Sequence, residues 1–369
     1  MAPIALCIYD GDDKFAIPVL VGQYSQRLVP YLASHGAGLG RINADTAPDA
    51  DRSDKIEPVQ DQIALSLGFV PFEDHSASVM KSTAPGQHWQ GAESARAMRF
   101  DRFVGIDWSG ARGVRHPAVQ VAVAEAGRGA PVLVPPPAGA SAWSRLAVLD
   151  WLGGLEGDVL VGMDAGFGFA AVPPFTGPAR ALWAEIDAVC ADEPDLGGHA
   201  FVEHRRDAFW MGAADGPRYL RAHLRVTEAV YAASRLGQPT SNFVLLGASQ
   251  VGKATLSAMR LLHRLGWPVW PFDPLPEGGP VILEIYAQAF ARMAGVRGKI
   301  RDRAALAAAL ARLGSDAPAT LPERFPDHVG DALLTAAGLR AIAGEPRWWA
   351  PAAMTPAIAA TEGWTFGVA

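Results

Sequence analysis

Hydrophobic and polar positions recur along this chain in two patterns, and together they predict an α/β protein. Short, almost wholly apolar runs predict buried strands, and longer runs with apolar residues three or four positions apart predict helices. The strands are expected at residues 103–107, 118–124, 131–134, 158–164, 242–246 and 281–286, and the helices at 143–155, 180–191, 218–236, 254–265, 303–313 and 327–341. This order predicts a three-stranded antiparallel meander, followed by a helix that crosses over to a parallel fourth strand.

The pattern also divides the chain into two predicted parts. Residues 1–100 are expected to form a small α/β segment of unknown role, with a strand at 3–9, helices at 25–34 and 59–67, and a linker at 83–92. Residues 101–369 are expected to form the main domain, a mixed sheet with flanking helices. A Pro-, Gly- and Arg-containing stretch at about 173–240 interrupts the element order and is interpreted as a helical insertion.

Composition narrows the classes of protein that remain. The chain has 369 residues, half of them hydrophobic, which suffices for two domains or for one large domain with insertions. A formal net charge of -6 argues against a generally basic nucleic-acid binder, but not against an enzyme with a local basic groove. Only Cys7 and Cys190 are present, which excludes a disulfide framework and suits a cytoplasmic protein. No apolar run is long enough to span a bilayer, so no membrane partner is expected, and nothing indicates an oligomeric state.

Acidic residues end or interrupt three of the predicted strands. Asp107 and Asp164 each end an apolar run, and Glu284 lies inside one. A strand-end aspartate either forms a turn with its own backbone or binds a metal ion at the carboxyl edge of the sheet. An acid inside an apolar strand is costly to bury unless it is paired or bound to metal. Glu284 therefore binds metal, faces solvent, or pairs with Arg292 or Lys253.

Two more aspartates begin the last predicted helix. Asp327 and Asp331 are four residues apart and share one face. Asp327 suits an N-cap, so Asp331, one turn further on, is the stronger candidate ligand. If the strands of Asp107 and Asp164 are parallel neighbours, their carboxylates repel each other, and Mg²⁺ or Mn²⁺ relieves that repulsion. Two such ions can clamp the attacking and leaving oxygens of a phosphodiester.

In their order along the chain, the motifs around these acids resemble a known family. The motifs are Ile106-Asp107-Trp108-Ser109-Gly110-Ala111, Gly162-Met163-Asp164-Ala165-Gly166-Phe167, Leu283-Glu284-Ile285-Tyr286, Asp327-His328-Val329-Gly330-Asp331-Ala332-Leu333 and Glu362-Gly363-Trp364. They look like the bacterial family called domain of unknown function 429, regarded as nucleases of the ribonuclease H-like fold. The resemblance covers roughly residues 101–369. It implies a metal-dependent cluster of Asp107, Asp164, Glu284 and one helix aspartate.

A separate group of residues is suited to binding phosphate. Residues 247–253 have phosphate-loop spacing between a predicted strand and a predicted helix, but Ala254 replaces the Ser or Thr that binds Mg²⁺. The same turn approaches a nucleophile elbow around Ser249, with Val251 in place of the second glycine. The milder interpretation is a helix N-terminus that binds a substrate phosphate together with Lys253. The candidate phosphate-binding residues are Lys253, Ser109, Arg297 and Lys299, of which the last two belong to the densest basic stretch.

The sequence thus predicts an α/β protein with a ribonuclease H-like mixed sheet, flanking helices, a helical insertion and a small N-terminal α/β segment. The expected function is metal-dependent hydrolysis of phosphodiester bonds in a nucleic acid or nucleotide, with Mg²⁺ or Mn²⁺ as cofactor. Asp107 and Asp164 would bind metal, and Glu284 and Asp331 would complete the cluster and orient the attacking water. One alternative is an actin-like, sugar-kinase-like or phosphate-loop phosphotransferase, and another is a non-catalytic binding module on the same fold. His328, beside the helix acids, either starts the helix or moves protons.

Overall fold

The computed structural model describes residues 6–10, 13–17, 39–41, 99–212, 223–234, 237–246 and 251–369. Contacts within the chain divide it into two units, residues 1–83 and 84–369. In the first unit, β1 (Leu6–Asp10) pairs antiparallel with both β2 (Asp13–Ile17) and β3 (Leu39–Arg41), so the strand order is β2-β1-β3. The strand expected at 3–9 overlaps β1. The helices expected at 25–34 and 59–67 lie outside the described residues.

The second unit is built on a mixed sheet with the strand order β10-β9-β7-β4-β5-β6, and β8 also pairs with β9. Strands β4, β5 and β6 form an antiparallel meander, whereas β7, β8, β9 and β10 run parallel to the strands they pair with. The predicted α/β class and the predicted meander are therefore confirmed. The strands are β4 (Arg102–Asp107), β5 (Gln120–Glu125), β6 (Val132–Val134), β7 (Val159–Asp164), β8 (Val269–Trp270), β9 (Val281–Ile285) and β10 (Thr365–Phe366).

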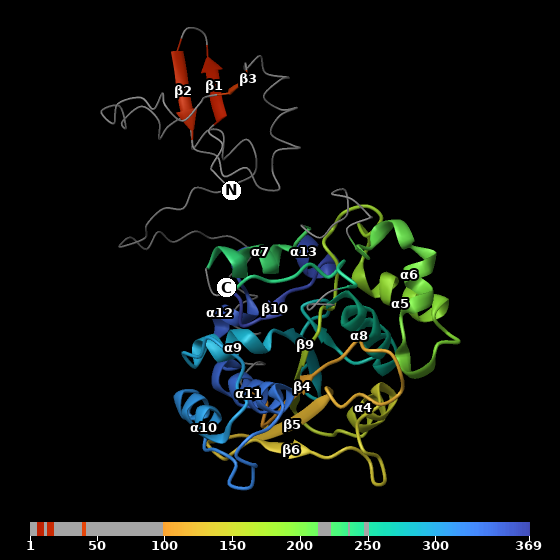
Figure 1. Ribbon diagram of the computed structural model, residues 1–369, viewed down its shortest axis with the longest axis vertical. Coiled ribbons are helices and arrows are strands. Elements are labelled where there is room, and N and C mark those ends of the chain that lie inside the picture. The colour runs from red at the N-terminus through yellow and green to blue at the C-terminus, as the bar shows by residue number, and fades with distance from the viewer. Residues whose placement is uncertain are drawn as a thin grey trace. The chain divides into compact units, whose positions relative to one another are not determined.

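Helices cover both faces of this sheet (Figure 1). One face packs against α9 (Ala287–Met293), α10 (Arg303–Arg312) and α11 (Asp327–Ile342), and the other packs against α4 (Arg145–Gly153), α5 (Ala179–Val189) and α8 (Val251–Leu265). The shorter helices are η2 (Pro194–Leu196), α6 (His199–His204), η3 (Arg206–Ala208), α7 (Val226–Ala233), α12 (Pro346–Trp349) and α13 (Pro356–Thr361). None of the helices in the described residues is both long and apolar enough to cross a membrane.

Alternation along β7 determines which face each side chain joins. Leu160 belongs to the apolar cluster that contains α11, and Met163 belongs to the cluster that contains α4, α5 and α8. Because successive strand residues point to opposite faces, Asp164 points to the same face as Leu160. Asp107 is its register partner on β4 and points the same way. Both strand-end aspartates therefore project toward the side of the sheet that α11 covers.

Two glycines let α11 lie directly on the strands. A Cβ atom at Gly105 would lie 2.4 Å from the backbone oxygen of Ala332, and one at Gly162 would lie 2.7 Å from a methyl carbon of Leu339. Any side chain at these positions would push the helix away from the sheet. Each glycine stands two residues before a strand-end aspartate, so the close approach brings the start of α11 near those carboxylates.

The segment expected to form a strand at 242–246 does not form one. It contributes only an isolated bridge between Trp210 and Val244. Its apolar residues are buried by aromatic packing instead, with the Phe243 ring 4.9 Å from the Phe169 ring. The prediction was wrong because a short apolar run indicates burial, and burial does not require a partner strand. The turn at 247–250, and the start of the helix expected at 218–236, lie outside the described residues.

Candidate active site

Asp107 and Asp164 lie side by side at the carboxyl edge of two parallel strands. They are direct register partners in β4 and β7, and neighbouring strands are about 4.8 Å apart. Only 12% of the Asp107 side chain is exposed. The last residue of each strand thus places a carboxylate at the same edge and on the same face, as the sequence hypothesis of a shared acidic site requires.

Helix α11 brings a third carboxylate to this edge. Asp331 lies one turn inside the helix and is 6% exposed. Its negative charge raises the pKa of both strand-end aspartates, so it is close enough to act on each of them. Of the four acids expected in the cluster, the structure therefore brings together Asp107, Asp164 and Asp331.

The two strand-end carboxylates are held in an unfavourable electrostatic environment. Burial is the main reason why the pKa of Asp107 is raised, and the charge of Asp331 adds to it. For Asp164, burial and then the charges of Asp107 and Asp331 raise the pKa well above its ordinary range. Keeping such acids ionised at neutral pH costs folding free energy. A cluster of this kind is typical of a functional site.

Two basic side chains contact the cluster. The Nδ1 atom of His328 is 2.7 Å from Oδ2 of Asp107, and this hydrogen bond raises the pKa of His328. The ammonium of Lys299 donates to Oδ2 of Asp331 at 2.6 Å and lies 3.9 Å from Oδ2 of Asp327. Burial lowers the pKa of Lys299, but the hydrogen bond to Asp331 outweighs it and the pKa is raised. The Lys299 ammonium offsets part of the negative charge, and so does His328 when it is protonated.

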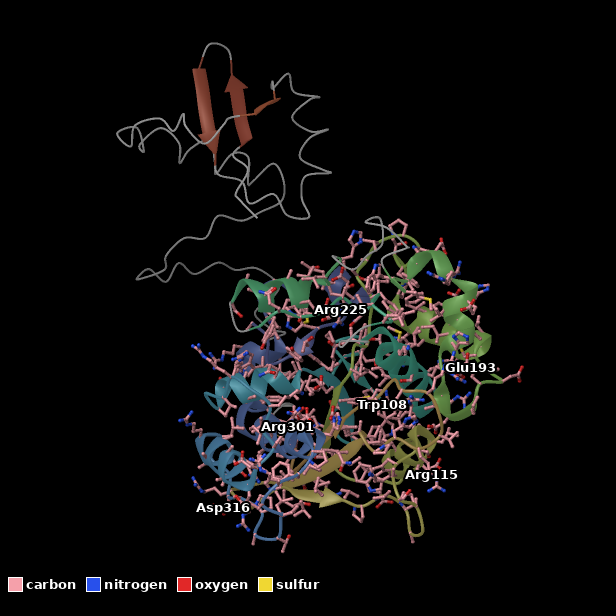
Figure 2. The ribbon with its side chains drawn as sticks, in the orientation of Figure 1. Trp108, Arg115, Glu193, Arg225, Arg301 and Asp316 are labelled. Carbon is pink, nitrogen blue, oxygen red and sulfur yellow. The ribbon has the colours of Figure 1, made fainter. Side chains whose placement is uncertain are left out.

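Asp327 lies at the rim of the cluster. It is the first residue of α11, and Pro326 occupies the N-cap position, so the interpretation of Asp327 as N-cap was wrong. Proline has no N–H and a fixed φ, which suits it to a position just before or within the first turn. The Asp327 carboxylate instead lies 3.5 Å from the guanidinium of Arg301, which Figure 2 shows beside α11.

The structure does not bring Glu284 to the cluster, which corrects the predicted role of this residue. Glu284 is the register partner of Met163, not of Asp164. Its side chain therefore points to the opposite face of the sheet. There, the two terminal nitrogens of Arg225 donate to its two oxygens at 2.5 and 2.8 Å. The backbone N–H of Phe167 and the hydroxyl of Thr365 each donate to it at 2.7 Å.

Arg225 is the partner that sequence reasoning missed, since Arg292 and Lys253 were the candidates. It is 2% exposed and lies immediately before α7 (Figure 2). Burial lowers its pKa, but the carboxylates of Glu284 and Glu228 outweigh burial and raise the pKa above its ordinary value. A Glu three residues after Arg225 was visible in the sequence, but nothing there connected this pair with Glu284.

The candidate phosphate-binding residues occupy three places. Lys253 lies in the first turn of α8, against the turn that follows Asp107, because a Cβ atom at Gly110 would lie 2.6 Å from the Lys253 Cβ. The Ser109 hydroxyl accepts a hydrogen bond from the backbone N–H of Ala111 at 3.3 Å. Lys299 is bound to Asp331 as described above. Arg297 is exposed and lines a separate hollow.

A cavity of about 360 Å³ opens beside the cluster. Asp164 and Lys299 are among its lining residues, and so are Arg225 and Glu284. The cavity therefore joins the acid cluster on one face of the sheet to the paired network on the other. It gives a bound molecule access to Asp164.

The ligand types at the acidic site suit a divalent metal, but the positions of the described side chains do not form a metal site. Three carboxylates supply the hard oxygen ligands that Mg²⁺ and Mn²⁺ prefer. Across the described parts of residues 99–369, however, no three His, Cys, Asp or Glu side chains are grouped so as to hold a metal ion. Two of the three carboxylates are engaged by His328 and Lys299. Metal binding thus requires these cations to move aside.

No family model, curated protein or solved structure matches this chain. The candidate site consequently rests on its own geometry.

Proposed function

We propose that this chain is a metal-dependent nuclease with a ribonuclease H-like fold. The strand order β6-β5-β4-β7-β9, with an antiparallel meander followed by parallel strands, supports the fold. The motif resemblance noted in the sequence supports both the fold and the activity. The observation that carries the proposal is the register pairing of Asp107 with Asp164 at the ends of adjacent parallel strands.

The proposed reaction is hydrolysis of a phosphodiester bond. A water oxygen attacks phosphorus, the bond from phosphorus to the leaving oxygen breaks, and the water gives up a proton while the leaving oxygen gains one. Asp107, Asp164 and Asp331 would hold Mg²⁺ or Mn²⁺, and the bound ion would activate the water and offset charge on the phosphate oxygens. Glu284 has no part in this set, because its oxygens are bound by Arg225, Phe167 and Thr365.

Two further residues have roles that follow from their contacts. His328 is 40% exposed and hydrogen-bonded to Asp107, so it can exchange a proton between solvent and the site. Lys299 has 49% of its side chain exposed while its ammonium is held at the cluster. An ammonium in this position can bind a non-bridging phosphate oxygen once it leaves Asp331.

Cleavage assays test the proposal. Labelled single- and double-stranded DNA and RNA are incubated with the full chain in Mg²⁺, in Mn²⁺ and in chelator. We expect metal-dependent cleavage that Asp107→Asn and Asp164→Asn each reduce by about 100-fold or more. The matched control is Asp187→Asn on α5, whose carboxylate pairs with Arg260 and Arg264. Full activity of Asp107→Asn would refute the proposal.

A phosphate-loop nucleotide hydrolase is the second candidate, because the start of α8 lies against the turn that follows Asp107. An ATPase assay of Lys253→Ala separates the two. If the nuclease proposal holds, this variant weakens nucleic-acid binding at low salt and leaves turnover at saturating substrate almost unchanged. ATP hydrolysis that is abolished by Lys253→Ala and retained by Asp107→Asn would instead establish the phosphate-loop function.

A further inference from the structure

The body of the cavity beside Asp164 is larger than the proposed chemistry needs. Its volume of about 360 Å³ is within the range of small-ligand pockets. The reacting phosphate needs only the space next to Asp164 and Lys299, two of its lining residues. The Arg225–Glu284 pair also lines the cavity. The remaining space has room for a group that is attached to the phosphate.

Part of the cavity lining is a hydrogen-bonded polar network. Arg225 donates to Glu284 at 2.5 and 2.8 Å and to Glu228 at 3.0 Å. The hydroxyl of Thr365 donates to Glu284. These groups are bound to one another, so they shape the cavity and do not require a charged ligand to neutralise them.

The cavity lining also combines aromatic rings with carboxamides. The rings of Tyr231 and Tyr286 meet edge to face, with centroids 5.1 Å apart. Gln238, Asn242 and Gln288 also line the cavity, and among the described residues Nε2 of Gln288 has no hydrogen-bond partner. Aromatic rings stack on nucleobases, and carboxamides match the donors and acceptors of base edges. This combination fits a nucleobase better than a sugar alone or an aliphatic chain.

A second hollow, of about 790 Å³, adjoins the first. The two share Gln238, and the second is lined by two arginines, Arg292 and Arg297. Lys299 follows Arg297 by two residues and lies at the acid cluster. Positive side chains therefore lie beside the cavity, where they can bind the phosphate of a neighbouring nucleotide.

We infer that the cavity receives one unpaired nucleotide of a single-stranded nucleic acid, and that the adjoining hollow binds the phosphate of a neighbouring nucleotide. The inference rests on the proposed nuclease function and specifies its substrate class. A base in a duplex is stacked and paired, so it can enter a cavity of this size only after it leaves the helix. A single strand needs no such step.

Binding by the full chain carrying Asp107→Asn tests the substrate class, because this variant slows cleavage. Fluorescence anisotropy compares labelled single-stranded DNA and RNA of about 12 nucleotides with the matching duplexes. We expect the single strand of at least one nucleic acid to bind at least about tenfold more tightly than its duplex. Equal affinity for single strands and duplexes would overturn the inference.

Tyr286 provides the test of the cavity itself. Tyr286→Ala should weaken single-strand binding by about tenfold through lost stacking, and Tyr286→Phe, which keeps the ring, should bind as the parent does. A second test uses a set of strands in which one nucleotide, at a different position in each strand, lacks its base. We expect the missing base to lower affinity at one position only. With that strand, Tyr286→Ala should cause no further loss of affinity, because the base it contacts is already absent. Additive losses at every position would overturn the inference. If Tyr286→Ala does not fold, Gln288→Ala is used in the same scan.

Arg297 provides the test of the second hollow. Arg297→Ala should reduce the slope of log affinity against log salt by about one unit. Arg115→Ala is the matched control, since Figure 2 shows this exposed arginine on the α4 side of the unit, away from Arg301. A mononucleotide that competes as tightly as the whole strand would overturn the part of the inference that concerns the neighbouring phosphate.

The two proposals can fail separately. Single-strand binding that depends on Tyr286, without cleavage of any oligonucleotide by the wild-type chain in Mg²⁺ or Mn²⁺, would refute the nuclease proposal and support the nucleotide cavity. Metal-dependent cleavage of duplex and single strand alike, unaffected by Tyr286→Ala, would refute the nucleotide cavity and support the nuclease proposal.

Discussion

Buried acids lie on both sides of the sheet, but they are paired on one side and repel one another on the other. On the α11 side, the charge of Asp331 raises the pKa of Asp107, and the charges of Asp107 and Asp331 raise that of Asp164, while His328 hydrogen-bonds to Asp107 and Lys299 to Asp331. On the opposite side, Arg225, Phe167 and Thr365 supply Glu284 with four hydrogen bonds.

The contrast distinguishes a buried acid that is fully paired from buried acids whose charges repel one another. A buried carboxylate whose oxygens are all bound contributes to a fixed structure. Carboxylates that repel one another reduce stability and persist where a ligand or a reaction needs them. Sequence position does not distinguish the two kinds, because Glu284 and Asp164 both belong to apolar strands.

The largest expected effect is on the paired side. Arg225→Ala would leave Glu284 and Glu228 buried without their cation, and we expect it to lower the free energy of unfolding by about 3–5 kcal/mol. Urea unfolding measures this. Arg115→Ala, an exposed arginine, should stay within about 0.5 kcal/mol of wild type. If Arg225→Ala lowers the free energy of unfolding by less than about 1 kcal/mol, the pairing of Glu284 with Arg225 does not stabilise this side of the sheet.

The next effect belongs to the acid cluster. Mn²⁺ or Mg²⁺ should stabilise the folded chain, by about 1.4 kcal/mol at ten times its dissociation constant. Asp107→Asn should remove most of the resulting rise in Tm. Lys299→Gln should enlarge it, because its ammonium no longer competes for Asp331.

Arg303→Gln is the control for Lys299→Gln, since Arg303 pairs with Glu323 and does not contact the cluster. Thermal melting at a series of metal concentrations gives all four curves. A Tm that does not respond to millimolar metal in the wild-type chain would contradict a metal site at these carboxylates.

The smallest expected effect is a gain in stability, whereas Arg225→Ala should cause a loss. Asp164→Asn should raise stability at neutral pH by about 1 kcal/mol, because it removes a buried, repelled charge. The raised pKa of Asp164 means that the folded chain binds its proton more tightly than the unfolded chain does. Wild-type stability therefore falls as pH rises from the unfolded pKa, about 3.9, through the folded one. The gain should vanish below about pH 4.

Asp187→Asn is the matched control, because it should change stability at neutral pH in the opposite direction to Asp164→Asn. Burial raises the pKa of Asp187, but its hydrogen bonds with Arg260 and Arg264 outweigh burial and lower it. Its stabilising contribution is present above the unfolded pKa and is lost as pH falls, so this variant should be less stable at neutral pH. Melting curves from pH 3.5 to 8 distinguish the two. Destabilisation by Asp164→Asn at pH 7 would favour a turn-forming role for that residue.

Much of the second unit could be predicted because its signals are local. The apolar runs that end at Asp107 and Asp164 defined β4 and β7 nearly to the residue. Trp143 to Leu155 was expected to be helical, and α4 occupies Arg145–Gly153 with Ser144 as its N-cap. The run at 242–246 failed because the same apolar signal serves a buried loop. Whether an apolar run forms a strand depends on its pairing with neighbouring strands, and the run itself does not show that pairing.

The sequence alone determined which residues end strands, which begin α11, and therefore that Asp107, Asp164 and Asp331 were available to one site. Tertiary structure decided which acids meet. A register that pairs Glu284 with Met163 turns that side chain away from Asp164, and a shift of one residue would have reversed it. Arg225, distant in sequence, then became its partner. Strand register and long-range pairing depend on the contacts of the whole sheet. A local pattern of residues therefore cannot predict them.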